Sequence, residues 1–195
     1  IFPAGRLCRV AGFILMEKCA IFIDGGYLNR INRDYFDSSS IDYLKLCDEI
    51  CNTLKLTRLR TYYYNSMPII RKGNKEDEKK HSKMQLFFAS LKRLPRFEVK
   101  LGRLQLIGGQ FKQKMIDALM SLDIVSMCFD NQIQQAILIA GDSDFIPAIK
   151  KAKDCGAIIH LFYHPKSVHN EMLDEVDELH ILSEELINKC RKRSL

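Results

Sequence analysis

The chain has 195 residues, 47% of them hydrophobic, and a formal net charge of +6. This length fits one domain of ordinary size, and the apolar content is enough to fill a core between two layers. No apolar run approaches the roughly 18 residues that a membrane-spanning helix needs, so we expect a soluble protein without a membrane partner.

The first residues and the cysteines bear on where the chain folds and works. Residues 1–15 show neither a clean periodicity nor a complete signal peptide, because the apolar stretch at 10–15 is shorter than the roughly 7–15 residues of a signal core. We therefore expect residues 1–15 to be a leader or extension outside the fold and residues 16–195 to form a single domain. Seven cysteines at irregular spacing, without a CxxC pair, favour a reducing cytoplasm over a disulfide framework.

Strands and helices alternate along the predicted chain. In chain order we expect a strand at 19–23, helices at 27–36 and 41–54, a strand at 56–64, a helix at 78–94, a strand at 97–107, a helix at 111–129, a strand at 136–140, a helix at 145–154 and a strand at 157–163. The first strand and the last two are almost wholly apolar, which is typical of strands buried on both faces. Ser40 is the predicted N-cap of the second helix.

The order of these elements predicts the fold class. Buried strands that alternate with helices call for an α/β fold, with a parallel sheet of about five strands and helices on both faces. Ligands of such sheets bind beyond the carboxyl ends of the strands. Polar residues at those strand ends are therefore the first candidates for a functional site.

Aspartates follow two of the buried strands. Asp24 ends the first strand, and Asp142 and Asp144 come directly after the strand at 136–140. Because parallel strands present their carboxyl ends at one edge of the sheet, we expect these three carboxylates to lie close together. Taken singly, each could be a turn former, and Asp144 could simply cap the helix that begins at Phe145.

A further aspartate interrupts an apolar run on the predicted helix at 111–129. A buried charge at Asp117 would be costly unless it is paired, and Lys114, three residues earlier, could neutralise it. Asp123 follows six positions later, about 240° around the helix, so it need not face the same site as Asp117.

Clustered carboxylates point to a metal. Without compensating bases they resist ionising together, and a divalent cation relieves the repulsion. Oxygen ligands suit Mg²⁺ or Mn²⁺. Phosphodiester hydrolysis is the chemistry that most needs such a site, because the ion activates a water and shields charge on the attacked phosphate.

Positive charge is concentrated in the middle of the chain. Between Arg58 and Lys114 there are 15 Lys or Arg and 4 Asp or Glu. Such clustering is typical of a protein that binds a polyanion, although a solvated basic face is the simpler alternative.

Tyrosines 62–64 could stack on bases, although at least one must be core, and the loop at 65–75 could act as a flap. The residues expected to contact nucleic acid are Arg71, Lys72, Lys75, Lys79, Lys80, Lys83 and Lys114.

Five motifs occur in a fixed order along the chain. They are Phe22-Ile23-Asp24-Gly25-Gly26, Asp42-Tyr43-Leu44, Lys114-x-x-Asp117 with Asp123 behind it, Ala140-Gly141-Asp142-Ser143-Asp144-Phe145 and Leu173-x-x-Val176-Asp177. Together they resemble the NYN domain, a PIN-like group that contains LabA-type proteins, over residues of about 19 to 182. The Gly-Asp-Ser-Asp-Phe string after a buried strand is the most specific part of this resemblance.

The resemblance implies a Rossmann-like, PIN-like fold and a metal-dependent ribonuclease site. The implied ligands of Mg²⁺ or Mn²⁺ are Asp24, Asp117, Asp142 and Asp144. Asp123 matches a further position that the family usually keeps acidic. Many relatives carry Asn three residues after the first Asp, where this chain has Tyr27. Asn29 and Ser143 are the residues expected to support the site.

An endoribonuclease is the function expected from these residues, with RNA, single-stranded RNA included, as the partner. A non-cleaving RNA-binding or regulatory module of the same fold is the main alternative, which the departure at Tyr27 favours. A hydrolase of small phosphate esters would not need so extended a basic segment. A homodimer is left open. His160, His164 and His169 are expected to be structural rather than catalytic.

Overall fold

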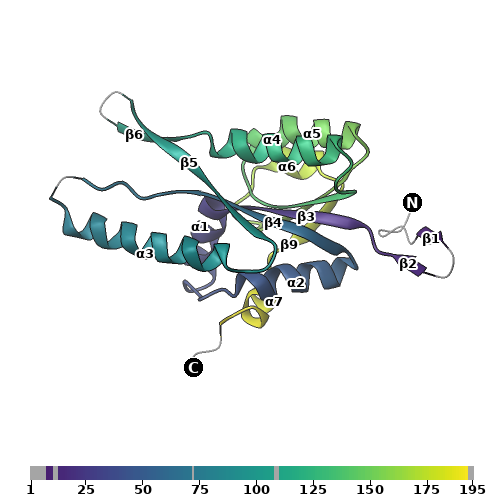
Figure 1. The fold of residues 1–195 in the computed structure, drawn as a ribbon, viewed down its shortest axis with the longest axis horizontal. Coiled ribbons are helices and arrows are strands. Elements are labelled where there is room, and N and C mark those ends of the chain that lie inside the picture. The colour runs from purple at the N-terminus through teal and green to yellow at the C-terminus, as the bar shows by residue number, and fades with distance from the viewer. Residues whose placement is uncertain (1–7, 11–12, 72, 108–109, 193–195) are drawn as a thin grey trace.

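The computed structural model describes residues 8–10, 13–71, 73–107 and 110–192, and within these it describes side chains for 16–71, 73–102 and 115–192 (Figure 1). Among the described helices, none has both the length and the apolar character that crossing a bilayer requires.

A seven-stranded sheet forms the centre of the molecule, with strand order β6-β5-β4-β3-β7-β8-β9. Its strands are β3 (Lys18–Asp24), β4 (Thr57–Ser66), β5 (Phe97–Ile107), β6 (Gln110–Lys114), β7 (Gln135–Ile139), β8 (Ile158–Tyr163) and β9 (Glu178–Ile181). All neighbouring pairs are parallel except β5 and β6. The predicted α/β class is therefore confirmed, with six parallel strands and an antiparallel edge strand instead of about five.

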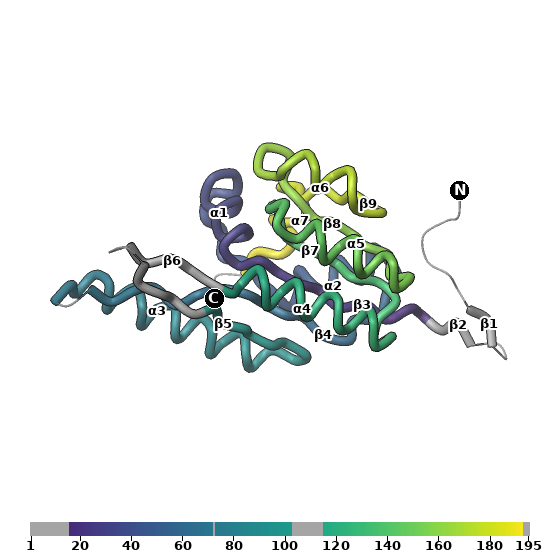
Figure 2. Tube along the Cα trace, turned by 90° about the horizontal axis from the view of Figure 1, so that it is seen from above, coloured from purple at the N-terminus to yellow at the C-terminus, as the bar shows by residue number. Residues whose placement is uncertain are grey.

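Helices cover both faces of this sheet (Figures 1 and 2). They are α1 (Gly25–Tyr35), α2 (Tyr43–Leu54), α3 (Lys75–Lys92), α4 (Ile116–Phe129), α5 (Ile146–Asp154), α6 (Asn170–Glu175) and α7 (Glu184–Lys189), with a 3₁₀ turn, η1, at Ser143–Phe145. Two cores result: residues from α1, α2, α3 and α7 pack on one face, and residues from α4, α5 and α6 on the other.

Side-chain alternation along β3 explains why both faces are buried. Cys19, Ile21 and Ile23 contribute to the core under α1 and α2, whereas Ala20 and Phe22 contribute to the core under α4 and α5. Because successive side chains of a strand point to opposite faces, the unbroken apolar run supplies both cores at once.

The predicted helix at 111–129 was wrong in its first part. The segment Gln110–Lys114 forms β6, which pairs antiparallel with β5, and α4 begins only at Ile116. Met115 separates the two with a positive φ of 79°. Single-sequence periodicity could not detect this hairpin because its partner strand supplies the hydrogen bonds.

Smaller differences occur at the ends of the sheet and of the helices. Asp42, not Ser40, caps α2 by accepting a hydrogen bond from the Lys45 backbone N–H at 3.0 Å. Strand β9 was not predicted, because it has only four residues and alternates between partly buried and exposed positions. Near the N-terminus, β1 (Cys8–Val10) and β2 (Phe13–Leu15) pair with each other in a separate two-stranded sheet.

Candidate functional site

Asp24 stands where β3 passes directly into α1. Its carboxylate accepts a hydrogen bond from the Tyr27 backbone N–H at 3.0 Å and so caps the helix. Gly25 follows because a Cβ at that position would collide with the ring of Tyr63 and the side chain of Asn65. The glycine therefore lets the start of α1 pack closely against β4, beside the Asp24 carboxylate.

The second pair of aspartates follows β7. Gly141 has no room for a Cβ, which would collide with the Tyr27 ring and the Ser167 carbonyl oxygen. Asp142 then caps the 3₁₀ turn, accepting a hydrogen bond from the Asp144 backbone N–H at 3.2 Å. Both carboxylate side chains belong to exposed residues, as a ligand-binding rim requires.

One cavity brings three of the predicted aspartates together. Its volume is about 230 Å³. The lining residues are Asp24, Gly26, Tyr27, Arg30, Ile116, Asp117 and Asp142. The ends of β3 and β7 and the first turn of α4 therefore meet as the parallel topology predicts. Asp144 does not line the cavity.

Burial and mutual repulsion act on these carboxylates. Burial raises the pKa of Asp24, and the charge of Asp117 raises it further, against the opposing effects of the Tyr27 N–H and Arg30. Burial also raises the pKa of Asp117, and the charges of Asp142 and Asp144 add to that rise. A positive ion in this cavity would lower the cost of keeping all of them ionised.

The carboxylates surround the cavity more loosely than we expected. No three of the four predicted aspartates, all of them described, have oxygen atoms within 4.8 Å of one another. This spacing fits Mg²⁺ better than a closed structural site, because Mg²⁺ keeps several of its waters and binds proteins through one or two carboxylates.

Asp123 lies outside this cavity. Its carboxylate accepts a hydrogen bond from the Tyr64 hydroxyl at 2.6 Å and forms an ion pair with Lys100 at 2.7 Å. Its charge is thus compensated within the fold. The predicted pairing of Asp117 with Lys114 concerns a side chain outside the described residues.

One residue of the loop predicted to act as a flap forms an ion pair within the protein. Arg71 forms a two-pronged ion pair with Asp77, with Nε and Nη2 at 2.7 and 3.0 Å from the carboxylate oxygens. Lys72 lies outside the described residues. Arg71 is therefore paired with a local carboxylate while its side chain stays 70% exposed, and its contact with nucleic acid stays a prediction.

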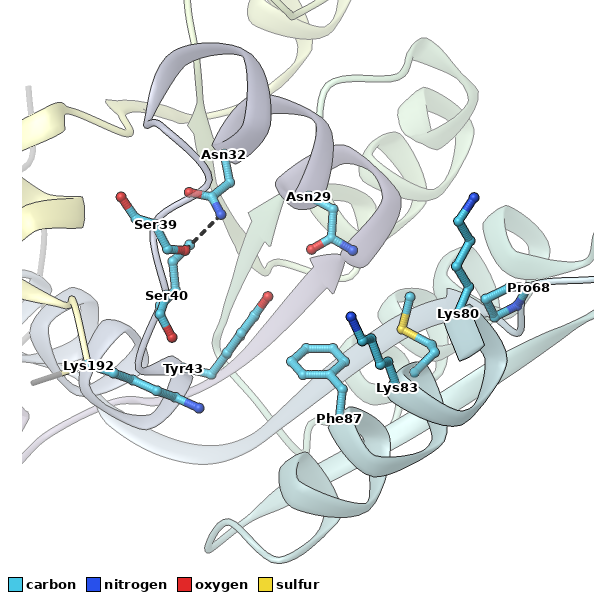
Figure 3. Close-up of a pocket in the computed structure, with 12 residues that line it drawn as sticks. Asn29, Asn32, Ser39, Ser40, Tyr43, Pro68, Lys80, Lys83, Phe87 and Lys192 are labelled. Carbon is cyan, nitrogen blue, oxygen red and sulfur yellow. Dashed lines mark hydrogen bonds between the residues drawn. The ribbon is translucent and has the colours of Figure 1, made fainter. Parts of the chain in front are cut away.

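Helix α3 presents its lysines differently. Lys80 and Lys83 line a second cavity, of about 540 Å³, whereas Lys75 and Lys79 are exposed elsewhere on the helix. Figure 3 shows Lys80, Lys83 and Phe87 on α3, opposite Asn29 of α1. The remaining lining residues are Asn32, Ser39, Ser40, Ile41, Tyr43, Pro68, Met84 and Lys192.

Neither of the two predicted supporting residues lines the aspartate cavity. Asn29 lines the second cavity, with its amide 3.5 Å from the Tyr63 hydroxyl. Ser143 lies beside the carboxylates in sequence, and its hydroxyl is 3.1 Å from His169 Nδ1. The Tyr27 hydroxyl accepts a hydrogen bond from the His164 backbone N–H at 2.9 Å, so it braces β8.

Two expectations about individual side chains change. All of tyrosines 62–64 are buried, so they belong to the core and are not available to stack on bases. Arg30 was not predicted, yet it lines the aspartate cavity. The signal for it was its place one turn after Gly26 on a helix that begins at the candidate site.

Comparison with known proteins matches the NYN domain to residues 18–184. The chain belongs to the NYN domain family. This confirms the family indicated by the motifs, and with it the PIN-like nuclease fold.

Individual relatives of this NYN domain add little on function. The uncharacterized protein y4oD of Sinorhizobium fredii is 33% identical over 69 residues, which cover 35% of this chain and 32% of that protein. The chain thus matches about a third of that relative's length. A crystal structure of a protein of unknown function, VPA0982 from Vibrio parahaemolyticus, has a TM-score of 0.61 at 19% identity, covering 87% of this chain and 95% of that one. That likeness shows the fold.

Proposed function

We propose that this NYN domain is a metal-dependent endoribonuclease whose Mg²⁺ or Mn²⁺ is held by Asp24, Asp117, Asp142 and Asp144. The observation that carries the proposal is the cavity lined by three of these carboxylates, two of which have raised pKa values. Asp144 supports it from just outside, where its charge acts on Asp117.

The residues that line the aspartate cavity would have different roles in hydrolysis. A bound ion supplies an activated water and shields charge at the attacked phosphate. Asp24 and Asp142 would hold the ion from two strand ends, and Asp117 would hold it from α4. Among the described residues that line this cavity, Arg30 is the cation, and it would donate hydrogen bonds to a phosphate oxygen.

The second cavity is the part proposed to hold RNA. Lys80 and Lys83 offer positive charge for phosphates, while Asn29 and Phe87 offer an amide and an aromatic ring for a base. Single-stranded RNA fits this combination because its unstacked bases can reach both groups. We place the reaction in the cytoplasm, where free thiols persist.

A non-cleaving RNA-binding module is the second candidate. It is favoured by Tyr27, whose hydroxyl is already engaged by the His164 N–H, and by the open spacing of the carboxylates. In that case the lysine cavity would bind RNA while the aspartates contributed no hydrolysis.

Cleavage of labelled single-stranded RNA by wild type and Asp142→Asn, with Mn²⁺, Mg²⁺ or chelator, separates these candidates. We expect metal-dependent internal cuts by wild type and a loss of at least about a hundredfold in Asp142→Asn, a barrier change of about 3 kcal/mol. Asp174→Asn, an exposed aspartate on α6, is the matched control and should cleave normally. RNA binding without cleavage would favour the module, and full activity of Asp142→Asn would exclude Asp142 as a ligand.

A further inference from the structure

Two histidines and a glutamate converge where β8 and β9 pair. His160 Nδ1 lies 3.1 Å from His180 Nε2 and 3.3 Å from a carboxylate oxygen of Glu178. The same oxygen lies 3.6 Å from His180 Nε2. Among the described residues, this is the one group of three or more metal-ligand side chains whose ligand atoms all lie within 4.8 Å of each other.

Strand register builds this cluster. His160 of β8 stands opposite Glu178 of β9, and Phe162 opposite His180, so alternate residues of both strands share one face. Phe162 belongs to the core under α1 and α2, which places the cluster on that face of the sheet. Phe22 of β3 belongs to the core on the opposite face. Asp24 comes two residues after Phe22, so its side chain is directed toward that opposite face as well. The cluster is thus separate from the aspartate cavity.

Neighbouring side chains fix the orientation of the His160 ring. Its Nε2 is hydrogen-bonded to the side-chain oxygen of Gln135, and the amide nitrogen of Gln135 donates to Glu17. Because the Gln135 oxygen can only accept, His160 Nε2 carries the proton and Nδ1 presents its lone pair to Glu178 and His180. Such an outer hydrogen bond is the usual arrangement for a metal-binding histidine.

The second ring is also held in place. His180 stacks on Phe162 with ring centroids 4.6 Å apart and an interplanar angle of 18°. Its side chain is 23% exposed and that of Glu178 is 30% exposed, whereas that of His160 is 1% exposed. An ion could therefore reach the cluster from solvent, past two partly exposed ligands, and meet a buried third one.

We propose that His160, Glu178 and His180 bind one Zn²⁺ ion. Tetrahedral Zn²⁺ with bonds of about 2.0–2.1 Å separates its ligands by about 3.3–3.4 Å, and the three distances here scatter around that value. Two imidazoles, a carboxylate and one open position form a known zinc ligand set. His180 also lines a cavity of about 490 Å³, which gives the open position room for a water.

Zinc bound at this cluster would stabilise the C-terminal part of the fold. Strand β9 is a four-residue strand at the edge of the sheet, and α7 follows it. An ion shared by β8 and β9 would fasten this segment to the sheet, so its loss should lower the thermal stability of the folded chain. A cluster held by hydrogen bonds alone, with His180 Nε2 donating to His160 Nδ1, would instead show no response to zinc.

Metal titration of the metal-stripped full chain tests the proposal. We would measure Zn²⁺ binding by calorimetry, Co²⁺ binding by visible absorption and the Tm with and without Zn²⁺. Wild type should bind one ion at this site, show the absorption of tetrahedral Co²⁺ with nitrogen and oxygen ligands, and melt at higher temperature with Zn²⁺. His180→Gln and Glu178→Gln should each weaken binding at least about a hundredfold, because changes at outer partners alone cost about 10–100-fold.

Two controls keep the result specific. His81→Gln, on α3, should bind Zn²⁺ as wild type does, and Asp142→Asn should keep the tetrahedral Co²⁺ absorption of the histidine cluster even if it loses an ion at the aspartate cavity. Circular dichroism of each metal-free variant shows whether it has folded, and two ligand variants are used because either could fail. The proposal is overturned if wild type binds no Zn²⁺, if the tetrahedral Co²⁺ absorption survives in both ligand variants, or if Co²⁺ shows thiolate charge-transfer bands.

Discussion

Two cavities of opposite chemistry border helix α1. One is lined by Asp24, Asp117 and Asp142, and the other by Lys80, Lys83 and Lys192. The larger, lysine-lined cavity has no acidic residue among the described residues that line it. This contrast teaches that the chemical step and the grip on a polyanion can be assigned to different surfaces, which mutations should separate.

The helix itself explains the separation. Gly26, Tyr27 and Arg30 line the aspartate cavity, whereas Asn29 and Asn32 line the lysine cavity. At about 100° per residue, these two sets lie on different sides of the helix. A strand of RNA that passes over α1 could therefore contact both cavities.

The largest expected effect distinguishes two aspartates of α4. Asp117→Asn should lower Mn²⁺-dependent RNA cleavage at least about a hundredfold, because it removes a charge from the proposed metal site. Asp123→Asn should leave cleavage near the wild-type level and lower the free energy of unfolding by about 1.5–3 kcal/mol, because it weakens the bonds to Tyr64 and Lys100. The measurements are initial cleavage rates and urea unfolding of both variants.

The reverse pattern would break the comparison. If Asp123→Asn abolished cleavage while remaining folded, the ion would have to lie nearer to the Lys100 ion pair than to the cavity. If Asp117→Asn unfolded the protein, Asp117 would be a structural residue.

A smaller effect is expected at the lysine cavity. Lys80→Ala with Lys83→Ala should flatten the plot of log K against log salt by up to about 1.4, because each single-strand phosphate contributes a slope of about −0.7. Mn²⁺ affinity should not change, since the aspartates are untouched. Fluorescence anisotropy of labelled RNA at several salt concentrations gives the slope.

Lys79→Ala is the control for that prediction. Lys79 is exposed on α3 but does not line the cavity, so its removal should change the slope less than either cavity lysine does. An equal loss from all three lysines would mean that RNA tracks the whole exposed face of α3, as the sequence alone suggested.

The smallest effect is on the pH dependence of stability. Burial and the charge of Asp117 raise the pKa of Asp24 in the folded protein above its ordinary value. The folded state then holds this proton more tightly than the unfolded chain. Metal-free protein should therefore gain stability as the pH falls from neutral through the raised pKa, with the gain complete below the ordinary carboxyl pKa.

Asp24→Asn should remove this part of the pH dependence while keeping the helix cap, because Asn is as good an N-cap as Asp. The quantity to compare is the unfolding free energy of wild type minus that of the variant across pH. A difference that stays flat, or that favours wild type at neutral pH, would show that the Asp24 carboxylate is not destabilised by its surroundings.

The central strands and the position of the aspartates at one edge of the sheet could be predicted from the sequence. The apolar runs fixed β3 and β7 to within one or two residues, and their parallel arrangement placed Asp24 and Asp142 on one edge. The hairpin of β5 and β6, the engagement of Asp123 by Lys100 and the burial of all three tyrosines depend on partners distant in sequence. Periodicity and spacing carry no information about those contacts, so the sequence could not show that Asp123 and the tyrosines were already occupied.

Crystals soaked in Mn²⁺ test the central claim most directly, because the anomalous scattering of the ion locates it without reference to activity. The account predicts a peak in the cavity within coordination distance, directly or through a water, of Asp24 and Asp142, and no peak there in Asp142→Asn. A wild-type cavity that remains empty at millimolar Mn²⁺, or an ion bound only at Asp123, would contradict it.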